Sequence, residues 1–341
     1  MKKSLMTLGV LALFVLMAYG QEKKFALYSV AFYNMENLFD TIHDEGKNDY
    51  EYLPNGTNQW NTMKYKAKLK NMSEILSLLS TDKLPMGPAI IGVSEIENYR
   101  VLEDILKQPT LADRGYQYVH YEGEDQRGVD CAFFYNPKLF ELTNSKLVPY
   151  VYINDTIHKT RGFLIASGNI AGEKMHFIVN HWPSRAAASP ARERAGEQVR
   201  AIKDSLLRED SAAKIVIMGD MNDDPMDKSM AVALGAKRKP ADVGPTDLYN
   251  PWWDTLKKGY GTLMYKGKWN LFDQIVFTGN LLGTDRSTLK FYKHEIFRRD
   301  FMFQKEGKYK GYPKRTQAGG VWLNGYSDHL PTIIYLIKEM K

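Results

Sequence analysis

The chain has 341 residues, a formal net charge of +6 and a single cysteine. One cysteine excludes an intrachain disulfide, and the scattered lysines and arginines exclude a dense basic tail of the kind that binds nucleic acid. The length is sufficient to bury a core as one large domain or two small ones, and the mild positive excess suits an anionic substrate.

The first twenty residues are typical of a cleaved targeting segment. A basic head, Met1–Lys3, precedes an uncharged apolar run over residues 5–17, and small residues follow at positions 18 and 20. We expect a signal peptide at residues 1–20, a mature domain at 21–341, and a secreted or periplasmic product. The apolar run is shorter than the roughly 20 residues that span a bilayer, so we expect no stable membrane anchor after cleavage.

Short apolar runs rich in β-branched and aromatic residues predict buried strands along the whole chain. These runs cover residues 29–33, 89–93, 131–135, 175–179, 214–218, 274–278 and 332–336. Because predicted strands outnumber predicted helices, we expect an α/β protein in which two sheets face each other and helices lie outside.

Two segments have apolar residues at helical spacing, residues 65–79 and 195–206. Ser189 is the expected N-cap of the second helix, with Pro190 at its first helical position. The polar, irregular segment 48–61 is expected to be a loop. The sequence leaves the oligomeric state open, with a monomer as the expectation.

Polar side chains flank six of the predicted strands, where catalytic groups are usually found. Each one alone has an ordinary structural explanation, such as a turn, a helix cap or an exposed histidine. Together they combine hard oxygen ligands with two histidines, a mixture that suits divalent-metal phosphate chemistry. They are Asn34 and Glu36, Glu95, Asn180 and His181, Asp220 and Asn222, Asp273, and Asp328 with His329.

These residues occur in motifs that resemble those of the endonuclease/exonuclease/phosphatase family, which includes nucleases and sphingomyelinases. Each motif is weak alone, but six in the family's order from Asn34 to His329 are specific. The resemblance implies a four-layer α/β sandwich of two stacked mixed β-sheets flanked by helices, with the active site at one end. The matching segments are Phe32–Asn37, Ile91–Glu95, Asn180–Ser184, Gly219–Asn222, Phe272–Ile275 and Ser327–His329.

The resemblance also implies roles for individual residues. Glu95 would bind Mg²⁺, or Mn²⁺ or Ca²⁺ in its place, with Asn34 or Glu36 beside it. The catalytic residues would fall into three groups. Asp220 and Asn222 would position water and phosphate. Asp328 would orient His329, and the resemblance leaves open whether Asp220 or His329 is the base. His181 and Asp273 would contact the phosphate or assist the leaving group.

Asp130 has two interpretations that the sequence does not separate. It is either a partner of His181 or an ordinary aspartate at the edge of a strand. Four arginines are candidates for contacting phosphate, because the guanidinium group binds phosphate through paired hydrogen bonds. They are Arg161, Arg185, Arg192 and Arg194.

The predicted substrate is a phosphoester, with nucleic acid preferred and an endonuclease-type phosphodiesterase as the leading hypothesis. One alternative is a phosphomonoesterase, or an enzyme that acts on phospholipid head groups or inositol phosphates. Another is an inactive protein that binds a phosphate ligand on the same scaffold. A fold of this kind does not by itself select the substrate.

Overall fold

The computed structural model describes residues 23–153, 155 and 157–340. The expected signal peptide lies outside these residues. Among the described residues, no helix is long and apolar enough to cross a membrane.

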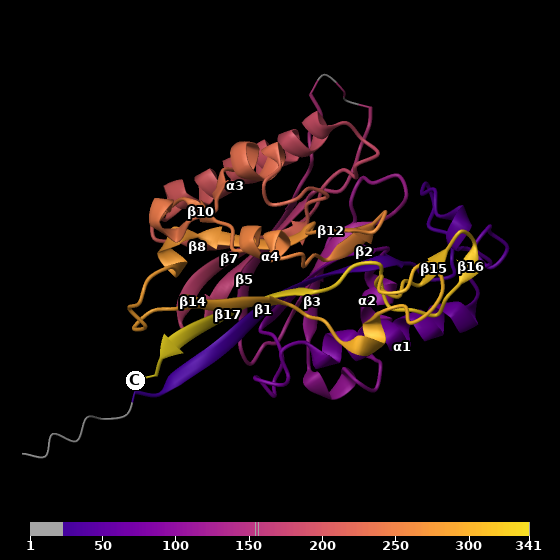
Figure 1. Ribbon diagram of the computed structural model, residues 1–341, viewed down its shortest axis with the longest axis horizontal. Helices are drawn as coiled ribbons and strands as arrows, with labels where there is room; N and C mark the ends of the chain where they lie inside the picture. Colours follow the sequence, from indigo (N-terminus) through magenta and orange to yellow (C-terminus); the bar gives the residue numbers. More distant parts are fainter. Residues whose placement is uncertain (1–22, 154, 156, 341) are drawn as a thin grey trace, which may run out of the picture.

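Two large sheets dominate the structure (Figure 1). The first has six strands, in the order β14 (Lys290–Ile296), β17 (Thr332–Glu339), β1 (Phe25–Leu38), β2 (Ile90–Ile96), β4 (Asp130–Tyr135) and β3 (Gln117–His120). The second has seven strands, in the order β5 (Glu141–Val148), β6 (Phe163–Ile170), β7 (Glu173–His181), β8 (Lys214–Asp220), β13 (Asp273–Thr278), β10 (Leu248–Tyr249) and β9 (Ala236–Lys237).

Both sheets are mixed, because each combines parallel with antiparallel strand pairs. Two small hairpins lie beyond them, β11 (Leu263–Tyr265) with β12 (Lys268–Asn270), and β15 (Gln317–Ala318) with β16 (Val321–Trp322). All seven predicted strands are confirmed. Six strands of the large sheets were not among the predicted runs: β3, β5, β6, β9, β10 and β14. Four of these, β3, β5, β9 and β14, are edge strands with less buried sequences.

The α-helices are α1 (Thr62–Leu78), α2 (Tyr99–Leu106), α3 (Ser189–Glu209) and the short α4 (Trp253–Lys257). The described residues also form six short helical turns: η1 (Tyr50–Tyr52), η2 (Ala112–Arg114), η3 (Ser229–Leu234), η4 (Pro240–Asp242), η5 (Gly279–Leu281) and η6 (Asp300–Met302). The predicted helices correspond to α1 and α3, and the expected loop at 48–61 contains only the turn η1.

The predicted N-cap of α3 is wrong by one residue. Ala188 occupies the cap position and makes no side-chain cap hydrogen bond. The Ser189 hydroxyl instead donates to Glu193 Oε1 at 3.4 Å, so the serine lies in the first turn with Pro190.

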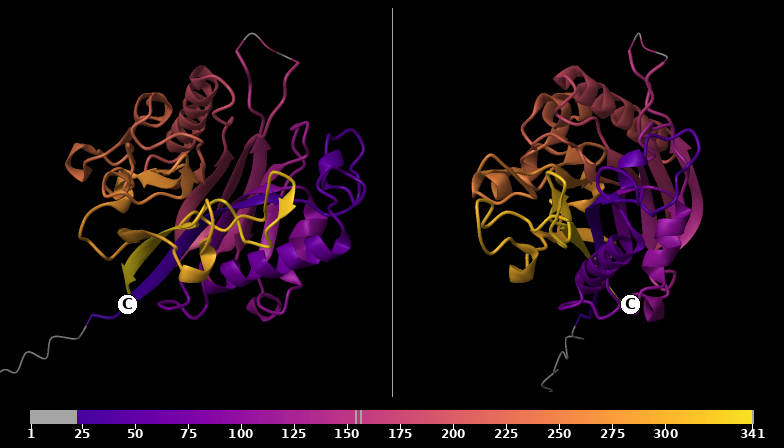
Figure 2. Two further views of the ribbon diagram at one scale, coloured as in Figure 1. Left: turned by 45° about the vertical axis from the view of Figure 1, so that its right-hand side comes forward. Right: turned by 90° about the vertical axis from the view of Figure 1, so that its right-hand side faces the viewer.

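Three apolar layers hold the sandwich together. Between the sheets, strand residues such as Phe32, Phe177 and Met218 form one buried cluster. Helices α1 and α2 pack on the outer face of the first sheet, and α3 packs on the outer face of the second, each burying its own cluster. Figure 2 shows α3 and α1 on opposite sides of the strands. This is the four-layer α/β sandwich that the family resemblance implies.

His294 on β14 gives the fold a pH-dependent contribution to stability. Its imidazole contacts Thr255 Oγ1 at 3.0 Å and packs edge-on against Trp252. Burial first, and then the positive charge of Lys258, lower the pKa of His294 from 6.5 to about 4. Between these values the unfolded chain binds a proton that the folded protein does not, so stability is lost as pH falls from 6.5 towards 4.

We therefore expect His294→Gln to flatten this part of the stability profile. The wild type should lose about 2 kcal/mol more than the variant between pH 7 and pH 4.5, after allowing for the partial exposure of the ring. Urea unfolding at several pH values measures the difference. His158→Gln, at an exposed histidine, is the matched control, and equal pH dependence of His294→Gln and wild type would contradict the prediction.

Candidate active site

The polar strand-end residues meet at one end of the sandwich. β1 and β2 are parallel, as are β7 and β8, so each pair ends at the same sheet edge. β13 and β17 run antiparallel to β8 and β1 and therefore begin where those strands finish. Asp220 is in register with His181 on one side and with Asp273 on the other. Strand direction thus places residues from distant parts of the chain together.

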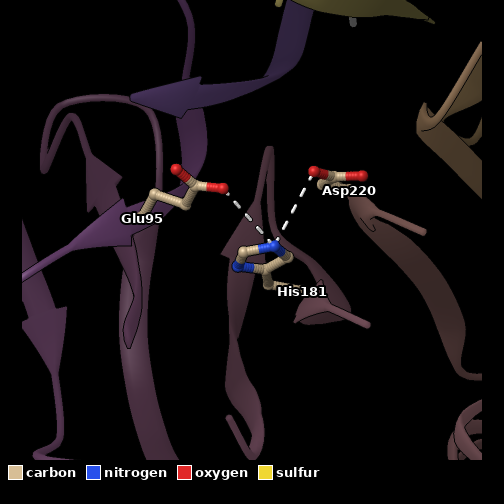
Figure 3. Close-up of side chains that lie close together, drawn as sticks. All are labelled: Glu95, His181 and Asp220. Atoms are coloured by element: carbon tan, nitrogen blue, oxygen red, sulfur yellow. Dashed lines mark ion pairs between the residues drawn. The ribbon is translucent and has the colours of Figure 1, made fainter. Parts of the chain in front are cut away.

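Glu95, His181 and Asp220 form the centre of this site (Figure 3). His181 Nε2 lies 3.6 Å from Glu95 Oε1 and 3.8 Å from Asp220 Oδ2. All three ligand atoms lie within 4.8 Å of one another. The cluster joins one residue of the first sheet to two of the second, so it forms only when the sheets stack.

An irregularity in β2 aims Glu95 at this centre. Glu95 has a φ of 59°, and the pairing of β2 with β4 shifts register between Ser94 and Ile96. A bulge of this kind redirects a side chain at a strand end, and a left-handed conformation in a residue other than glycine is typical of functional sites. Glu95 Oε2 accepts the Asn37 backbone N–H at 3.0 Å, which fixes the carboxylate.

Asn34 orients the two carboxylates of the centre. Its Nδ2 donates to Asp220 Oδ2 at 2.9 Å and to Glu95 Oε1 at 3.1 Å. Its Oδ1 accepts the Glu36 backbone N–H at 2.8 Å and is therefore already engaged. Asn34 reaches the predicted site, but it presents an amide nitrogen to the centre and acts as a positioning residue in this arrangement.

His329 is held by Asp273 and not by Asp328, which corrects the predicted roles of both aspartates. Asp273 is fully buried, and its Oδ2 lies 2.7 Å from His329 Nδ1. Asp328 Oδ1 is 4.0 Å from His329 Nε2. Asp328 lies at a bend before β17, and its carboxylate is directed to Arg315 and not to the imidazole. Asp273 thus supports His329 and does not reach the pocket.

Glu36 and Asp328 meet a different partner, Arg315, at the side of the site. Arg315 Nε donates to Glu36 Oε1 at 2.9 Å, and Arg315 Nη2 lies 2.9 Å from Asp328 Oδ2. Glu36 also accepts the Thr316 backbone N–H at 2.6 Å. The geometry does not support the predicted metal-binding role of Glu36, because its carboxylate is engaged by Arg315 and Thr316 and is not part of the cluster of Glu95, His181 and Asp220.

Asp130 pairs with a histidine, but not with His181. Its Oδ2 lies 3.3 Å from His120 Nε2 and accepts the Gly123 backbone N–H at 3.0 Å. Asp130 begins β4, so the ordinary interpretation as a strand-edge aspartate is the correct one.

A pocket of about 370 Å³ opens over the centre, lined by Glu95, Arg127, Arg161, His181, Ser184, Asp220, Asn222 and His329. Asn222 lies in it as predicted, although its Nδ2 donates to the Trp182 carbonyl at 3.1 Å. Of the four candidate arginines, only Arg161 reaches the pocket. Arg127 and Ser184 were missed as site residues, although Arg127 directly precedes the segment around Asp130 and Ser184 ends the His181 motif.

A sequence model of the endonuclease/exonuclease/phosphatase family matches residues 29–338. The chain belongs to this family. Its predicted activity as a metal-dependent phosphoric ester hydrolase is confirmed at the level of the family. No curated protein matches the chain.

Solved structures of the family share the fold at low sequence identity. A family protein from Bacteroides thetaiotaomicron is 15% identical with a TM-score of 0.57, covering 93% of this chain and 97% of that one. A mannosyl-6-phosphatase from B. thetaiotaomicron VPI-5482 is 15% identical with a TM-score of 0.56, covering 91% and 99%. TDP2 from D. rerio, solved with a single-stranded DNA product, is 14% identical with a TM-score of 0.53, covering 91% and 99%.

The electrostatics of this phosphoesterase site follow from burial and crowded carboxylates. Burial raises the pKa of Asp220 to about 7, with contributions from Asp273 and Glu95 that His329 opposes. Burial lowers the pKa of His329, but the negative charges of Asp273 and Asp220 outweigh burial and hold it well above its ordinary value. Burial, reinforced by Arg161 and Arg127, holds the pKa of His181 well below its ordinary value and keeps its imidazole neutral.

These residues fit a divalent cation. Glu95 and Asp220 offer carboxylate oxygens that repel each other, a cost that a cation would remove. His181 is neutral, as a metal ligand must be, and its Nε2 faces both carboxylate oxygens. This chain therefore has side-chain donors suited to the divalent metal on which the family depends.

Proposed function

We propose that the protein is a secreted or periplasmic Mg²⁺-dependent phosphodiesterase that cleaves nucleic acid by attack of water on phosphorus. One observation carries the proposal. A carboxylate and imidazole centre and two arginines, Arg127 and Arg161, line the same pocket. The layout of residues 1–20 supports export.

Arg161 has the features of a phosphate-binding residue. Its side chain is only 9% exposed, with Nη1 3.1 Å from Asp125 Oδ2 and Nη2 donating to the Trp182 carbonyl at 2.9 Å. Its Nε is buried and has no hydrogen-bond partner within the described part of the chain. Such an unsatisfied donor is costly to bury, and a phosphate oxygen in the pocket would satisfy it.

Asp220 and His329 are placed to handle the proton of the attacking water. Asp220 Oδ2 and His329 Nε2 are 3.8 Å apart, so one water can contact both. In the proposed reaction the water oxygen bonds to phosphorus, its proton passes to this pair, and the bond to the leaving oxygen breaks. Asp273 holds Nδ1 of His329, which keeps Nε2 directed at the pocket.

Glu95, Asp220 and His181 are the residues that would hold the metal. A divalent cation bound there would offset negative charge on the phosphoryl and leaving oxygens. Mg²⁺ is the proposed ion because two of the three groups are carboxylates, with Mn²⁺ and Ca²⁺ as alternatives that share this preference.

Nucleic acid is the preferred substrate, and the likeness to TDP2 solved with a single-stranded DNA product is consistent with it. The likeness to a mannosyl-6-phosphatase supports a second candidate, a phosphomonoester of a sugar. A panel of plasmid DNA, single-stranded oligonucleotides, RNA, sphingomyelin and mannose 6-phosphate, each with Mg²⁺, Mn²⁺, Ca²⁺ or EDTA, separates them. Cleavage of nucleic acid that EDTA abolishes supports the proposal, whereas hydrolysis confined to monoesters or lipid contradicts it.

Replacing Glu95 with glutamine should weaken the response to metal. The change removes one negative charge from the proposed cation site while keeping the side-chain size. We expect the Mg²⁺ concentration for half-maximal activity to rise by about 100-fold, comparable with the larger effects of disturbing a metal site. Glu45→Gln, at an exposed glutamate outside the site, is the control. An unchanged metal titration for Glu95→Gln would remove Glu95 from the metal site.

A further inference from the structure

A second pocket lies beside the active site. Its volume is about 540 Å³, within the range of pockets that bind small organic ligands. The walls are the β11–β12 hairpin and the segment 304–313, and Asp328 and Arg315 form the part nearest the active site. Its aromatic and basic lining residues are Tyr265, Lys266, Lys308, Tyr309, Tyr312 and Arg315.

The backbone couples this pocket directly to the catalytic histidine. Leu263 on β11 forms an antiparallel bridge with His329, and the Leu330 N–H donates to the Thr262 carbonyl at 2.8 Å. One wall of the pocket is therefore attached to the residue that handles the proton. A group bound in the pocket would adjoin a phosphate bound at His329.

The two walls are also joined to each other, so the pocket is preformed. Tyr312 Oη accepts the Gly267 backbone N–H at 2.6 Å, which ties the segment 304–313 to the hairpin. The Gln304 N–H donates to the Tyr312 carbonyl at 2.8 Å, and the Gly311 N–H donates to the Gln304 carbonyl at 2.9 Å. Binding to a preformed pocket costs less ordering entropy than binding to a mobile loop.

Two tyrosine rings in this pocket are unusually accessible. Tyr265 is 62% exposed and Tyr309 is 51% exposed. Tyr309 contacts the Tyr312 ring at a centroid distance of 5.4 Å and an interplanar angle of 73°, which leaves much of its surface uncovered. Exposed aromatic faces on a fixed wall are the usual means of stacking unpaired nucleobases.

The charges of the pocket favour an anion beside the aromatic group. Arg315 is neutralised by its ion pairs with Asp328 and Glu36. Lys266 and Lys308 form no ion pair among residues 23–153, 155 and 157–340, and they outnumber the remaining acid, Glu306. Their ammonium groups lie 5.3 Å and 5.5 Å from the centroids of the adjacent Tyr265 and Tyr309 rings. A cation next to an aromatic face suits a nucleotide better than a neutral lipid.

We propose that this pocket binds the nucleobase of the nucleotide adjoining the scissile phosphate, with the base stacked on Tyr265 or Tyr309 and the next phosphate near Lys266 and Lys308. This inference rests on the proposed nuclease function and names the part of the substrate that the enzyme recognises. It predicts a preference for unpaired bases, because a paired base has no free face to offer these rings.

The test compares a single-stranded oligonucleotide with one in which the nucleotides flanking a single cleavable linkage are abasic. The remaining linkages of both oligonucleotides are made resistant to hydrolysis. We expect Tyr265→Ala/Tyr309→Ala to lower kcat/KM on the intact oligonucleotide by about 10- to 100-fold, mainly through KM, because stacking contributes to substrate binding. On the abasic oligonucleotide, wild type and variant should be equal.

Tyr292→Ala, at a 53% exposed tyrosine on β14 away from the pocket, controls for loss of an exposed ring. If the double variant loses activity equally on both oligonucleotides, or on neither, the pocket does not bind a base. If the wild type cleaves no oligonucleotide but hydrolyses mannose 6-phosphate, the nuclease function itself is overturned together with the pocket's role. Thermal unfolding of all three proteins checks that the changes leave the fold intact.

Discussion

His329→Gln is expected to lower kcat by about 10²- to 10⁴-fold, the usual range for losing a group that transfers a proton in the reaction. His329 Nε2 lies in the pocket, 3.8 Å from Asp220 Oδ2. His181 Nε2 is equally close to that oxygen, but only His329 has its Nδ1 held by the buried carboxylate of Asp273. Glutamine can still donate to the buried Asp273 carboxylate, so the protein should fold. Single-turnover kinetics at saturating Mg²⁺ separate this loss in chemistry from a loss in binding.

His176→Gln is the matched control for this change. His176 is also a buried histidine, but it lies near the start of β7, at the end of the strand away from His181, and contacts Ser167 Oγ at 2.7 Å. Its replacement should leave kcat within a few-fold of the wild type. If His329→Gln keeps more than a tenth of the wild-type kcat, His329 does not take part in proton transfer.

Asp273→Asn is expected to lower kcat by about 10²- to 10⁴-fold, whereas Asp328→Asn should lower it by less than about 10-fold. Asp273 Oδ2 accepts from His329 Nδ1 at 2.7 Å and so selects the tautomer and the ring orientation. An asparagine can present an N–H to Nδ1 instead, which favours the wrong tautomer, as in a catalytic triad that loses its aspartate. Asp328 is 4.0 Å from the ring and pairs with Arg315.

A second measurement distinguishes orientation of His329 from a general loss of structure. Asp273 stabilises the positively charged form of His329, so its replacement should lower the imidazole pKa of His329 in an NMR titration with EDTA present. Asp328→Asn should shift that pKa less, because Asp328 is the more distant carboxylate. If the two variants lose kcat equally and shift the pKa equally, Asp273 has no special role.

The active site shows which parts of a distributed site can be inferred from one sequence. The strands and their polar ends were predictable because a buried strand has an apolar pattern that polar residues interrupt. The identity of the chemistry was predictable because carboxylates, amides and histidines recurred at these ends in the family's order. The partner of each side chain was not predictable, because it depends on how strands pair and stack.

Two errors illustrate that limit. Asp328 precedes His329 in the chain, yet the residue that holds His329 is Asp273, which is 56 positions away and starts a strand of the other sheet. Glu36 lies two positions after Asn34 and belongs to the same motif, but its carboxylate is engaged by Arg315. Proximity in sequence suggested both wrong assignments, and neither backbone conformation nor sheet stacking has a local sequence signal strong enough to correct them.

The fold class, seven of the strands, and the candidate site residues Glu95, His181, Asp220 and His329 could all be inferred from sequence patterns. The other features depend on the tertiary structure. In the folded protein Asp273 contacts His329, and Asn34 positions the carboxylates of the centre. Arg127 and Arg161 line the pocket over that centre, and Tyr265 and Tyr309 line the pocket beside it. The physical reason is that these contacts join the two sheets or their connecting loops, so they exist only after the strands have paired and the sheets have packed.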